Sequence, residues 1–474
     1  MENKQSLSSP AGERENIMGT MDINPLLIKL SVPMMVSMLV QALYNVVDSI
    51  FVSHVSESAL TAVSLAFSLQ NVMIAVGVGT GVGVNALLSK SLGEKNFDAA
   101  NKAAVNGIFL AFCSWAAFAL LGGFFSRTFM ALQTDVPEII AYGDTYLTII
   151  AVASVGMMFQ ICFERLLQST GKTIYTMLSQ GLGAVINLIL DPIFIFPLKM
   201  GVVGAGIATV IGQVAAGCLA LLYLRRLKTV HIRREDLRPT RKLTCRILAL
   251  GFPSLLTQML SALVQITLNN LMRAYGAATV YGSDIALSVY GMMMKVYQIA
   301  HSMFVGVSSA IQPINGYNFG ANHYARVQKT FHIASLIAVG ISVVWFLIFM
   351  VFPRQIASCF VSDNALYLDC AQHCFRLYML AFFLYGLHMT SASFFQGIGR
   401  PGKSLLIPLA RQGCFLIPLA LLLSRSFGLD GALLAAPIAD ALAFPLCLLL
   451  ARWEFRSWRR KGWLCKGERK YRAS

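Results

Sequence analysis

Four polar residues follow one face of the first long apolar segment of the chain. Gln41, Tyr44, Asn45 and Asp48 stand at positions i, i+3, i+4 and i+7, a spacing that places them on one side of a helix. Polar and ionisable groups within apolar helices are costly and mark ion or substrate pathways. We therefore interpret Asp48 as a candidate cation ligand and Gln41, Tyr44 and Asn45 as residues lining a substrate cavity.

A second polar face lies on a later apolar segment. Gln180, Asn187 and Asp191 stand at i, i+7 and i+11, again on one helical face. Pro192 follows Asp191, bends the helix and leaves the carbonyl of Leu188 without its usual donor. Carboxylate, amide and freed carbonyl oxygens are hard ligands that suit a cation such as Na⁺. Gln180 is predicted to line the substrate cavity.

Three of these groups lie at similar depth. Asp48, Asp191 and Thr209 are each predicted about 6–10 Å inside the same end of their helices, at 1.5 Å per residue. If the two carboxylates are close, the pair can hold a proton near neutral pH or a Na⁺ ion. The alternative is a pair of hydrogen-bonded aspartates that only fix helix packing.

Three further ionisable residues fall in apolar segments: Lys295, Arg411 and Asp440. Either cation can neutralise Asp440, extend towards an interface or line the central cavity. We place Lys295 and Arg411 among the cavity candidates.

The elements that position these residues are membrane-spanning helices. The 474-residue chain is 56% hydrophobic and 13% charged, whereas a soluble domain is roughly 25% charged. This composition excludes a soluble enzyme, a disordered protein and a disulfide scaffold. Apolar stretches near the ~20 residues that cross a bilayer predict an all-α polytopic membrane protein of about twelve helices, near 27–52, 60–88, 104–124, 145–164, 174–197, 202–224, 249–272, 284–311, 331–352, 377–397, 404–424 and 430–451.

These helices divide into two sets of six. The predicted organisation is a tail (1–25), an N-lobe (26–224), a basic linker (225–246), a C-lobe (247–452) and a basic tail (453–474). The loops on the side of the termini hold 30 Lys and Arg, and the opposite loops hold six. The positive-inside rule then places both termini in the cytoplasm of a cell-membrane protein. The net charge of +16 is explained by these loops, so we expect no nucleic-acid partner.

The two halves are related in sequence. Gly79, Asn85 and Gly93 recur 227 residues later as Gly306, Gln312 and Gly320. Six helices per half give both halves the same orientation, which makes a parallel repeat about an axis along the membrane normal. Transporters that rock two bundles about a central site use this arrangement.

The repeat also tests whether the polar residues are only structural. The same offset carries Asn187, Asp191 and Thr209 to Phe415, Leu419 and Ala436, and aligning Pro33 with Pro253 carries Asp48 to Leu268. A group needed only for the shared fold would more often occur in both halves. The ion site is therefore predicted in the N-lobe alone.

With these residues in place, the chain resembles the multidrug and toxic compound extrusion (MATE) family from about residue 25 to 452. The resemblance rests on Pro33…Gln41-x-x-Tyr44…Asp48, on Asn187-x-x-x-Asp191-Pro192 and Thr209, and on Ser91-Leu-Gly93 and Asn318-Phe-Gly320-Ala321. It implies a non-enzymatic antiporter that exports drug-like organic cations or amphipathic compounds against Na⁺ or H⁺, without another cofactor and as a monomer. It further implies that Asp48, Asn187, Asp191 and Thr209 form the coupling-ion site and that Pro33 bends the first helix.

Three alternatives stay open from the residues. A flippase for lipid-linked saccharides has a related helical plan but should have more basic residues inside the membrane than Lys295 and Arg411. A uniporting channel needs no carboxylate pair. A membrane-embedded enzyme needs convergent catalytic groups, and the seven His residues are scattered.

Overall fold

Every regular element in the described part of the chain is helical. The computed structural model describes residues 16–53, 57–226, 239–361 and 364–464, except the side chains of residues 45, 46, 48–50, 52, 53, 57 and 60. The first half contains α1 (Ile17–Thr20), α2 (Ile23–Ser53), α3 (Glu57–Gly93), α4 (Phe97–Ala131), α5 (Pro137–Val152), α6 (Val155–Ser169), α7 (Thr173–Ile195) and α8 (Gly201–Arg226).

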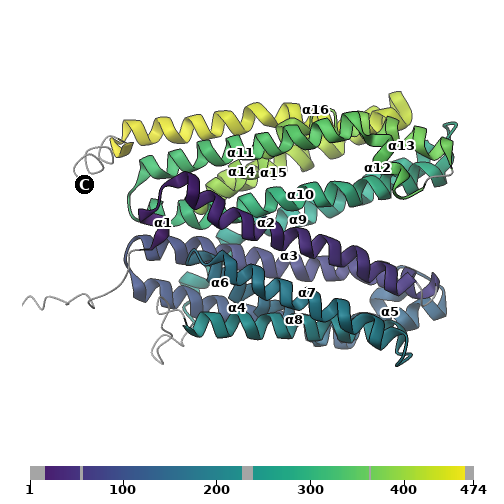
Figure 1. Ribbon diagram of the computed structural model, residues 1–474, viewed down its shortest axis with the longest axis horizontal. Coiled ribbons are helices and arrows are strands. Elements are labelled where there is room, and N and C mark those ends of the chain that lie inside the picture. Colours follow the sequence, from purple (N-terminus) through teal and green to yellow (C-terminus); the bar gives the residue numbers. More distant parts are fainter. Residues whose placement is uncertain (1–15, 54–56, 227–238, 362–363, 465–474) are drawn as a thin grey trace, which may run out of the picture.

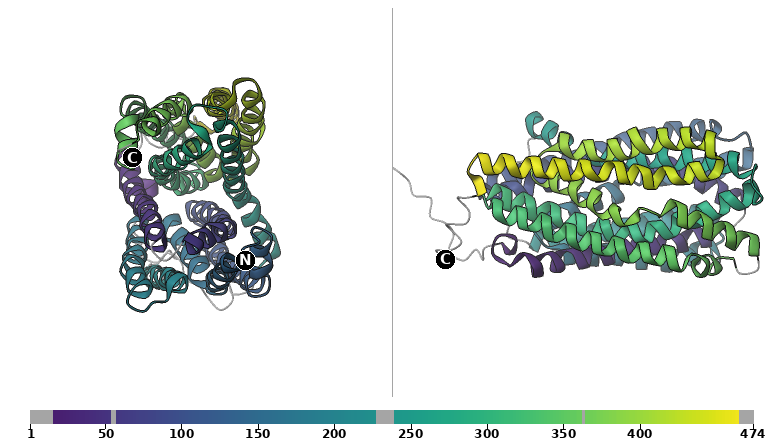
Figure 2. Two further views of the ribbon diagram at one scale, coloured as in Figure 1. Left: turned by 90° about the vertical axis from the view of Figure 1, so that its right-hand side faces the viewer. Right: turned by 90° about the horizontal axis from the view of Figure 1, so that it is seen from above.

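The second half repeats this order with more interruptions. It contains α9 (Arg241–Gly276), α10 (Gly282–Gly320), α11 (Tyr324–Val351), α12 (Pro353–Ser358), α13 (Ala365–Tyr378), the 3₁₀ turn η2 (Phe382–Leu384), α14 (Tyr385–Gly397), α15 (Pro401–Pro408), the π-helical segment η3 (Leu409–Leu416) and α16 (Ile417–Arg460). The chain forms two helical bundles that lie side by side (Figures 1 and 2).

The helices confirm an all-α polytopic membrane protein. Among the described residues, eight helices are long and apolar enough to cross a membrane, or ten if the bent pairs α5–α6 and α13–α14 are each one span. The 60-residue stretch from Pro401 to Arg460 turns at Gly428, where φ is 59°, and so makes two passes. The 39-residue α10 is long enough to cross but more polar. Dividing the long stretch and including α10 accounts for the predicted twelve.

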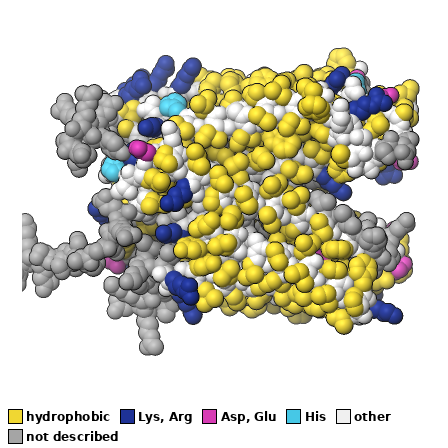
Figure 3. Space-filling model, viewed as in Figure 1, with side chains coloured by type: hydrophobic (Ala, Val, Ile, Leu, Met, Phe, Trp, Pro, Cys, Tyr) yellow, Lys and Arg dark blue, Asp and Glu magenta, His cyan; other side chains and the backbone are white. Residues whose placement is uncertain are grey.

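The surface has the pattern expected of such a protein. Hydrophobic side chains form a continuous belt, and Lys and Arg side chains gather towards the two ends (Figure 3). Large apolar side chains are exposed within the belt, among them Phe124 and Leu336 at 77% and 74%. Exposed apolar patches of this extent are typical of a lipid-facing surface.

The two halves bend at equivalent places. The bend between α5 and α6 is 44°, and so is the bend between α13 and α14. Ala153, in the first break, and Leu380, in the second, are 227 residues apart. This offset is the one predicted from the repeated glycines, so the internal repeat extends to the helix geometry.

The lobes also exchange their first helices. The start of α2 packs with α10 of the C-lobe, where Leu27 and Leu30 share a core with Val307 and Ile311. The start of α9 packs against the N-lobe core, to which it adds Ile247 and Leu250. Each lobe is therefore completed by the first helix of the other.

Glycines permit the close approach of the lobes at one end. A Cβ atom on Gly93 would lie 1.9 Å from the carbonyl oxygen of Tyr317, and one on Gly320 would lie 2.2 Å from that of Lys90. Gly93 and Gly320 are equivalent in the repeat, as are Lys90 and Tyr317. The ends of α3 and α10 thus cross symmetrically, which closes the molecule at the end where α2 begins and α16 ends.

The predicted tails differ from the structure at both ends. Asn16 and α1 fall in the predicted tail 1–25, yet they pack on both lobes: the Asn16 side chain donates to the Thr170 carbonyl at 3.3 Å, and Met18 is fully buried. The predicted tail 453–474 begins as helix, because α16 continues to Arg460. Most of the predicted linker, residues 227–238, lies outside the described residues.

Candidate functional site

The structure brings Asn187, Asp191 and Thr209 together between α7 and α8. The Asn187 amide nitrogen lies 3.3 Å from Asp191 Oδ1 and 3.3 Å from Thr209 Oγ1. All three residues are buried, and Asp191 is only 1% exposed. The predicted polar face of α7 is therefore a real contact surface, and three of the four predicted coupling-ion residues share one site.

The other orientation of the Asn187 amide joins the same partners. In that orientation the nitrogen donates to Asp191 Oδ2 at 2.9 Å and the oxygen accepts from the backbone N–H of Thr209 at 3.2 Å. The Thr209 hydroxyl donates to the Ala205 carbonyl at 3.0 Å. Thr209 and Asn187 are thus fixed around the Asp191 carboxylate in both orientations.

Two glycines allow α7 and α8 to approach closely enough for these contacts. A Cβ atom on Gly183 would lie 2.9 Å from the Gly212 carbonyl oxygen, and one on Gly212 would lie 2.7 Å from that of Gly183. Gly183 is one helical turn before Asn187, and Gly212 is three residues after Thr209. The absence of side chains at this crossing positions the polar groups beside it.

Two predicted residues cannot be placed at the site. The side chains of Asn45 and Asp48 lie outside those that the structure describes, so the predicted pair of Asp48 with Asp191 stays a prediction. Gln41, on the same face of α2, is exposed, and Tyr44 is half-buried. Gln41 lies about 27 Å along α2, a depth at which an exposed amide is expected to face water rather than lipid.

Lys295 has a similar position in the other lobe. It is exposed and lies about 20 Å from the start of α10. An ammonium group at that depth is stable only where it meets water or an anion. Its exposure is consistent with the predicted cavity-lining role.

The two prolines interrupt neither helix. Pro33 lies inside α2 and Pro192 inside α7, and both helices continue past them. The backbone N–H of Phe196 bonds the Pro192 carbonyl at the end of α7. Neither proline breaks its helix, and the bending at Pro33 and Pro192 stays a prediction.

Sequence reasoning missed a second buried carboxylate of the N-lobe. Glu164 on α6 is 3% exposed and accepts hydrogen bonds from Gln160 at 2.9 Å and from Gln180 at 2.7 Å. Gln180 also accepts from the Ser37 hydroxyl of α2. Gln180 therefore belongs to a network that links α2, α6 and α7. Gln160, one helical turn before Glu164, was the feature of the sequence that could have indicated a hydrogen-bonded, buried acid.

In the C-lobe, Arg411 pairs with Asp440. The Arg411 Nε donates to Asp440 Oδ1, and the two side chains are 11% and 6% exposed. The guanidinium carbon lies 4.9 Å from the centre of the Tyr385 ring. Of the roles left open for Arg411, the structure supports neutralisation of Asp440. The residue stands in η3, and π-helical segments are frequent at functional sites.

Aromatic rings surround this ion pair. Tyr385 stacks on Phe382 with ring centres 5.3 Å apart, and Tyr297 meets Tyr385 edge-on at 5.9 Å. The His301 ring lies 5.8 Å from Tyr297. These rings come from α10, η2 and α14, so the C-lobe ion pair lies beside an aromatic cluster.

Comparison with known proteins identifies related chains along nearly the whole length. The sequence model of the MatE family matches residues 33–193 and 253–422, one stretch in each lobe. The chain is 25% identical over 427 residues to the multidrug export protein MepA of Staphylococcus saprophyticus, covering 89% of this chain and 92% of the relative. It is 24% identical over 423 residues to MepA of Staphylococcus aureus, covering 89% and 91%.

Solved structures agree on the fold. A structure of MATE in complex with MaL6 superposes with a TM-score of 0.88 at 24% identity, covering 94% of this chain and all of that one. A MOP superfamily transporter from Pyrococcus furiosus, described as having a binding pocket of reverse polarity, superposes with a TM-score of 0.87 at 24% identity, covering 94% and 99%. Both share the arrangement of two bundles.

Proposed function

Because this chain belongs to the MatE family of membrane transporters, we propose that it exports drug-like organic cations or other amphipathic compounds in exchange for Na⁺ or H⁺. The relatives named above are multidrug export proteins, which supports the substrate class. We place the transporter in the cell membrane as a monomer with both termini in the cytoplasm. The basic residues at that end support this orientation.

The observation that carries the proposal is the burial of Asp191 beside Asn187 and Thr209. A carboxylate within a helix bundle has a desolvation cost of several kcal/mol, which a proton or a cation offsets. Asn187 and Thr209 supply further oxygen atoms, the ligand type that Na⁺ accepts. Asp48 is the fourth member of the proposed site, by its place on α2.

Exchange follows if the ion and the drug compete. A drug cation and a coupling cation that need the same negative charge cannot both be bound, so entry of one favours release of the other. Aromatic rings suit the cationic and apolar parts of varied compounds. Lys295 and Gln41 are proposed to face the cavity in which the exchange takes place.

Exchange requires two states of the lobes, and the contacts between the lobes support a proposal for one of them. The glycine crossing of α3 and α10 closes one end of the molecule. Opening at that end must separate Gly93 from Tyr317 and Gly320 from Lys90. We propose that ion binding near Asp191 favours one of these states, because a ligand shifts an equilibrium only through different affinities for its two states.

The flippase alternative is weakened by the C-lobe ion pair. Arg411 is bonded to Asp440 and is therefore not a free cation for the pyrophosphate of a lipid-linked saccharide. Of the two cations predicted inside the membrane, Lys295 therefore remains as a candidate of that kind.

Efflux of a cationic dye from sealed vesicles, under an imposed Na⁺ or pH gradient, tests the proposal. Asp191→Asn should abolish the gradient-dependent part of efflux while the protein stays folded and inserted. Asp369→Asn is the matched control, because its carboxylate is 56% exposed and lies in a surface ion pair. Gradient-driven efflux at the wild-type rate in Asp191→Asn would refute the assigned site, and no dye movement under either gradient would refute the export function.

A further inference from the structure

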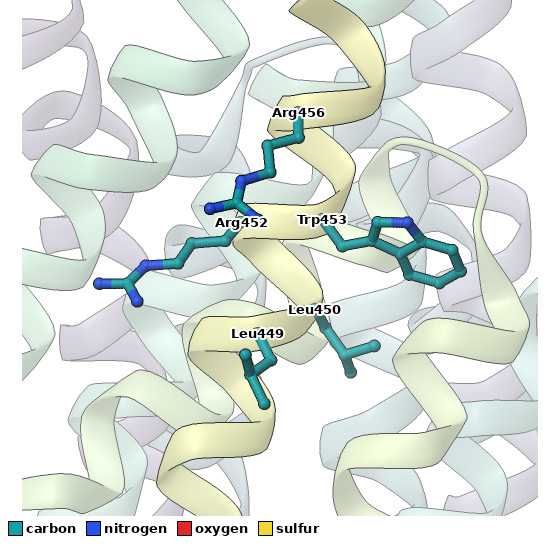
Figure 4. Close-up of a pocket in the computed structure, with 5 residues that line it drawn as sticks. All are labelled: Leu449, Leu450, Arg452, Trp453 and Arg456. Atoms are coloured by element: carbon teal, nitrogen blue, oxygen red, sulfur yellow. The ribbon is translucent and has the colours of Figure 1, made fainter. Parts of the chain in front are cut away.

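A pocket separate from the site between α7 and α8 lies on the outer surface of α16. It has a volume of about 320 Å³ and is lined by Leu449, Leu450, Arg452, Trp453 and Arg456. Figure 4 shows the two arginine side chains extending to one side of the helix, with Leu449 below them and Trp453 on the adjoining side. The lining therefore changes from apolar to cationic along the helix.

The two arginines are available to a ligand. Arg452 and Arg456 are both exposed, stand one helical turn apart and form no ion pair with any described residue. The nearby cations Arg400 and Lys403, in contrast, are paired: Arg400 lies 3.7 Å from Glu454, and Lys403 also pairs with Glu454. The buried Glu454 carboxylate thus pairs with Arg400 and Lys403, and among the described residues no carboxylate compensates the charge of the pocket.

The pocket lies at the edge of the hydrophobic belt. Leu449 and Trp453 are 62% and 63% exposed, and the helix ends at Arg460 two turns later. The Lys403 ammonium lies 4.3 Å from the centre of the Trp453 ring, which holds the indole in place. Exposed tryptophan beside arginine is typical of the level at which lipid headgroups lie.

We propose that this pocket binds the headgroup of an anionic phospholipid. Two guanidinium groups one turn apart suit a phosphate, since each offers paired N–H donors. Leu449, which is exposed, continues into the belt, where an acyl chain would lie. Basic pockets at a membrane interface bind acidic lipids by this chemistry. A zwitterionic lipid adds an ammonium group, which the two arginines repel.

Native mass spectrometry of the full-length protein, titrated separately with phosphatidylglycerol and phosphatidylcholine, tests this proposal. The variant Arg452→Gln/Arg456→Gln is compared with Arg459→Gln/Arg460→Gln, a pair of exposed arginines further along the same helix that do not line the pocket. At about 1 kcal/mol for each of the two arginines, the pocket variant should lose about 30-fold in affinity for phosphatidylglycerol. The control should lose less than about twofold.

A third variant and a competitor separate the remaining outcomes. Arg452→Lys/Arg456→Lys should keep part of the preference, which excludes misfolding as the cause of its loss. Equal loss in the pocket and control variants would show general charge attraction and overturn the proposal, as would equal binding of the two lipids by the wild type. Displacement of the lipid by glycerol 3-phosphate, which has no acyl chain, would show a site for soluble phosphates and would also overturn it.

Discussion

Asn85 and Gln312 occupy equivalent positions of the two halves, 227 residues apart, and are hydrogen-bonded to each other. The Asn85 amide nitrogen donates to Gln312 Oε1 at 3.2 Å, and the Gln312 amide donates to the Val82 carbonyl at 3.3 Å. Both side chains are at most 2% exposed. The axis that relates the lobes therefore passes between these two amides, and alternation of the lobes has to act on this contact.

A methyl group at Gly320 should weaken the closed state. The Cβ atom of Gly320→Ala would lie 2.2 Å from the Lys90 carbonyl oxygen, so α3 and α10 must separate at that end. Overpacking of this kind costs about 1–3 kcal/mol. We expect a longer distance between two spin labels placed at the exposed positions of Lys102 and Lys329, which lie in different lobes. The distance is measured by pulsed electron paramagnetic resonance after the native cysteines have been replaced.

Gly340→Ala is the control for this experiment. A Cβ atom there meets nothing within 4 Å, and the residue lies in the middle of α11. Its label distances should match those of the wild type. An unchanged distance distribution in Gly320→Ala would mean that the glycine crossing does not set the closed state.

Removal of one partner of the C-lobe ion pair should destabilise the protein strongly, whereas replacement of both partners by apolar residues should destabilise it little. Arg411→Leu alone leaves the buried Asp440 without its partner, and we expect a loss of about 3–5 kcal/mol in the free energy of unfolding. The double variant Arg411→Leu/Asp440→Leu should recover most of that loss. Denaturation in mixed micelles measures both.

An exposed ion pair provides the comparison. Arg354 and Asp369 lie 3.4 Å apart with side chains more than half exposed, so Arg354→Leu should cost less than about 1 kcal/mol. If Arg411→Leu costs as little as Arg354→Leu, the Arg411–Asp440 pair is not a buried structural pair.

Removal of the Thr209 hydroxyl should weaken ion binding without unfolding the protein. Thr209→Val keeps the shape and removes the group that lies 3.3 Å from the Asn187 amide. A lost hydrogen bond is worth about 0.5–1.5 kcal/mol, so the half-saturating concentration of the coupling cation should rise by about 2- to 10-fold in efflux assays. Thr267→Val, which removes an exposed hydroxyl bonded only within α9, should leave it unchanged. Equal behaviour of the two variants would remove Thr209 from the site.

Arg326 should hold the N-terminal segment against the C-lobe. Its guanidinium donates to the carbonyl oxygens of Met18 and Met21 and to Asn318. Arg326→Ala should raise the rate of amide hydrogen exchange in residues 16–21 by about 10-fold or more, because hydrogen bonds to charged groups are worth about 1.5–3 kcal/mol. Exposed Lys329 is the control. Equal exchange rates in Arg326→Ala and Lys329→Ala would show that other contacts hold the segment.

The parts of the fold that follow from local pattern were predictable. The lengths of the apolar stretches predicted the helices, and the repeated glycines predicted the offset of 227 residues between the halves. Asn85 and Gln312, which are separated by this offset, are in contact in the structure. Glu164 was missed because it lies at the predicted end of its helix, where an acid is ordinary, and only packing against α7 buries it. The Arg411–Asp440 pair was one of several open pairings, since sequence does not fix which helices of a lobe adjoin.

For the candidate site as well, the features that depend on local sequence pattern were predictable. Helical spacing placed Asn187 and Asp191 on one face, and depth placed Thr209 at their level. The contact itself depends on Gly183 and Gly212, whose close approach is a property of the packed helices. Pairing of Asp48 with Asp191 remains a prediction.

The most direct test of ion-coupled export is cation movement driven by the exported compound. Vesicles that contain the purified protein and a cationic drug are diluted into drug-free medium, and uptake of radioactive Na⁺ or of protons is followed. We expect uptake of one of these ions in the wild type and in Asp369→Asn, and none in Asp191→Asn. Drug export without movement of either ion, or ion uptake at the wild-type rate in Asp191→Asn, would contradict it.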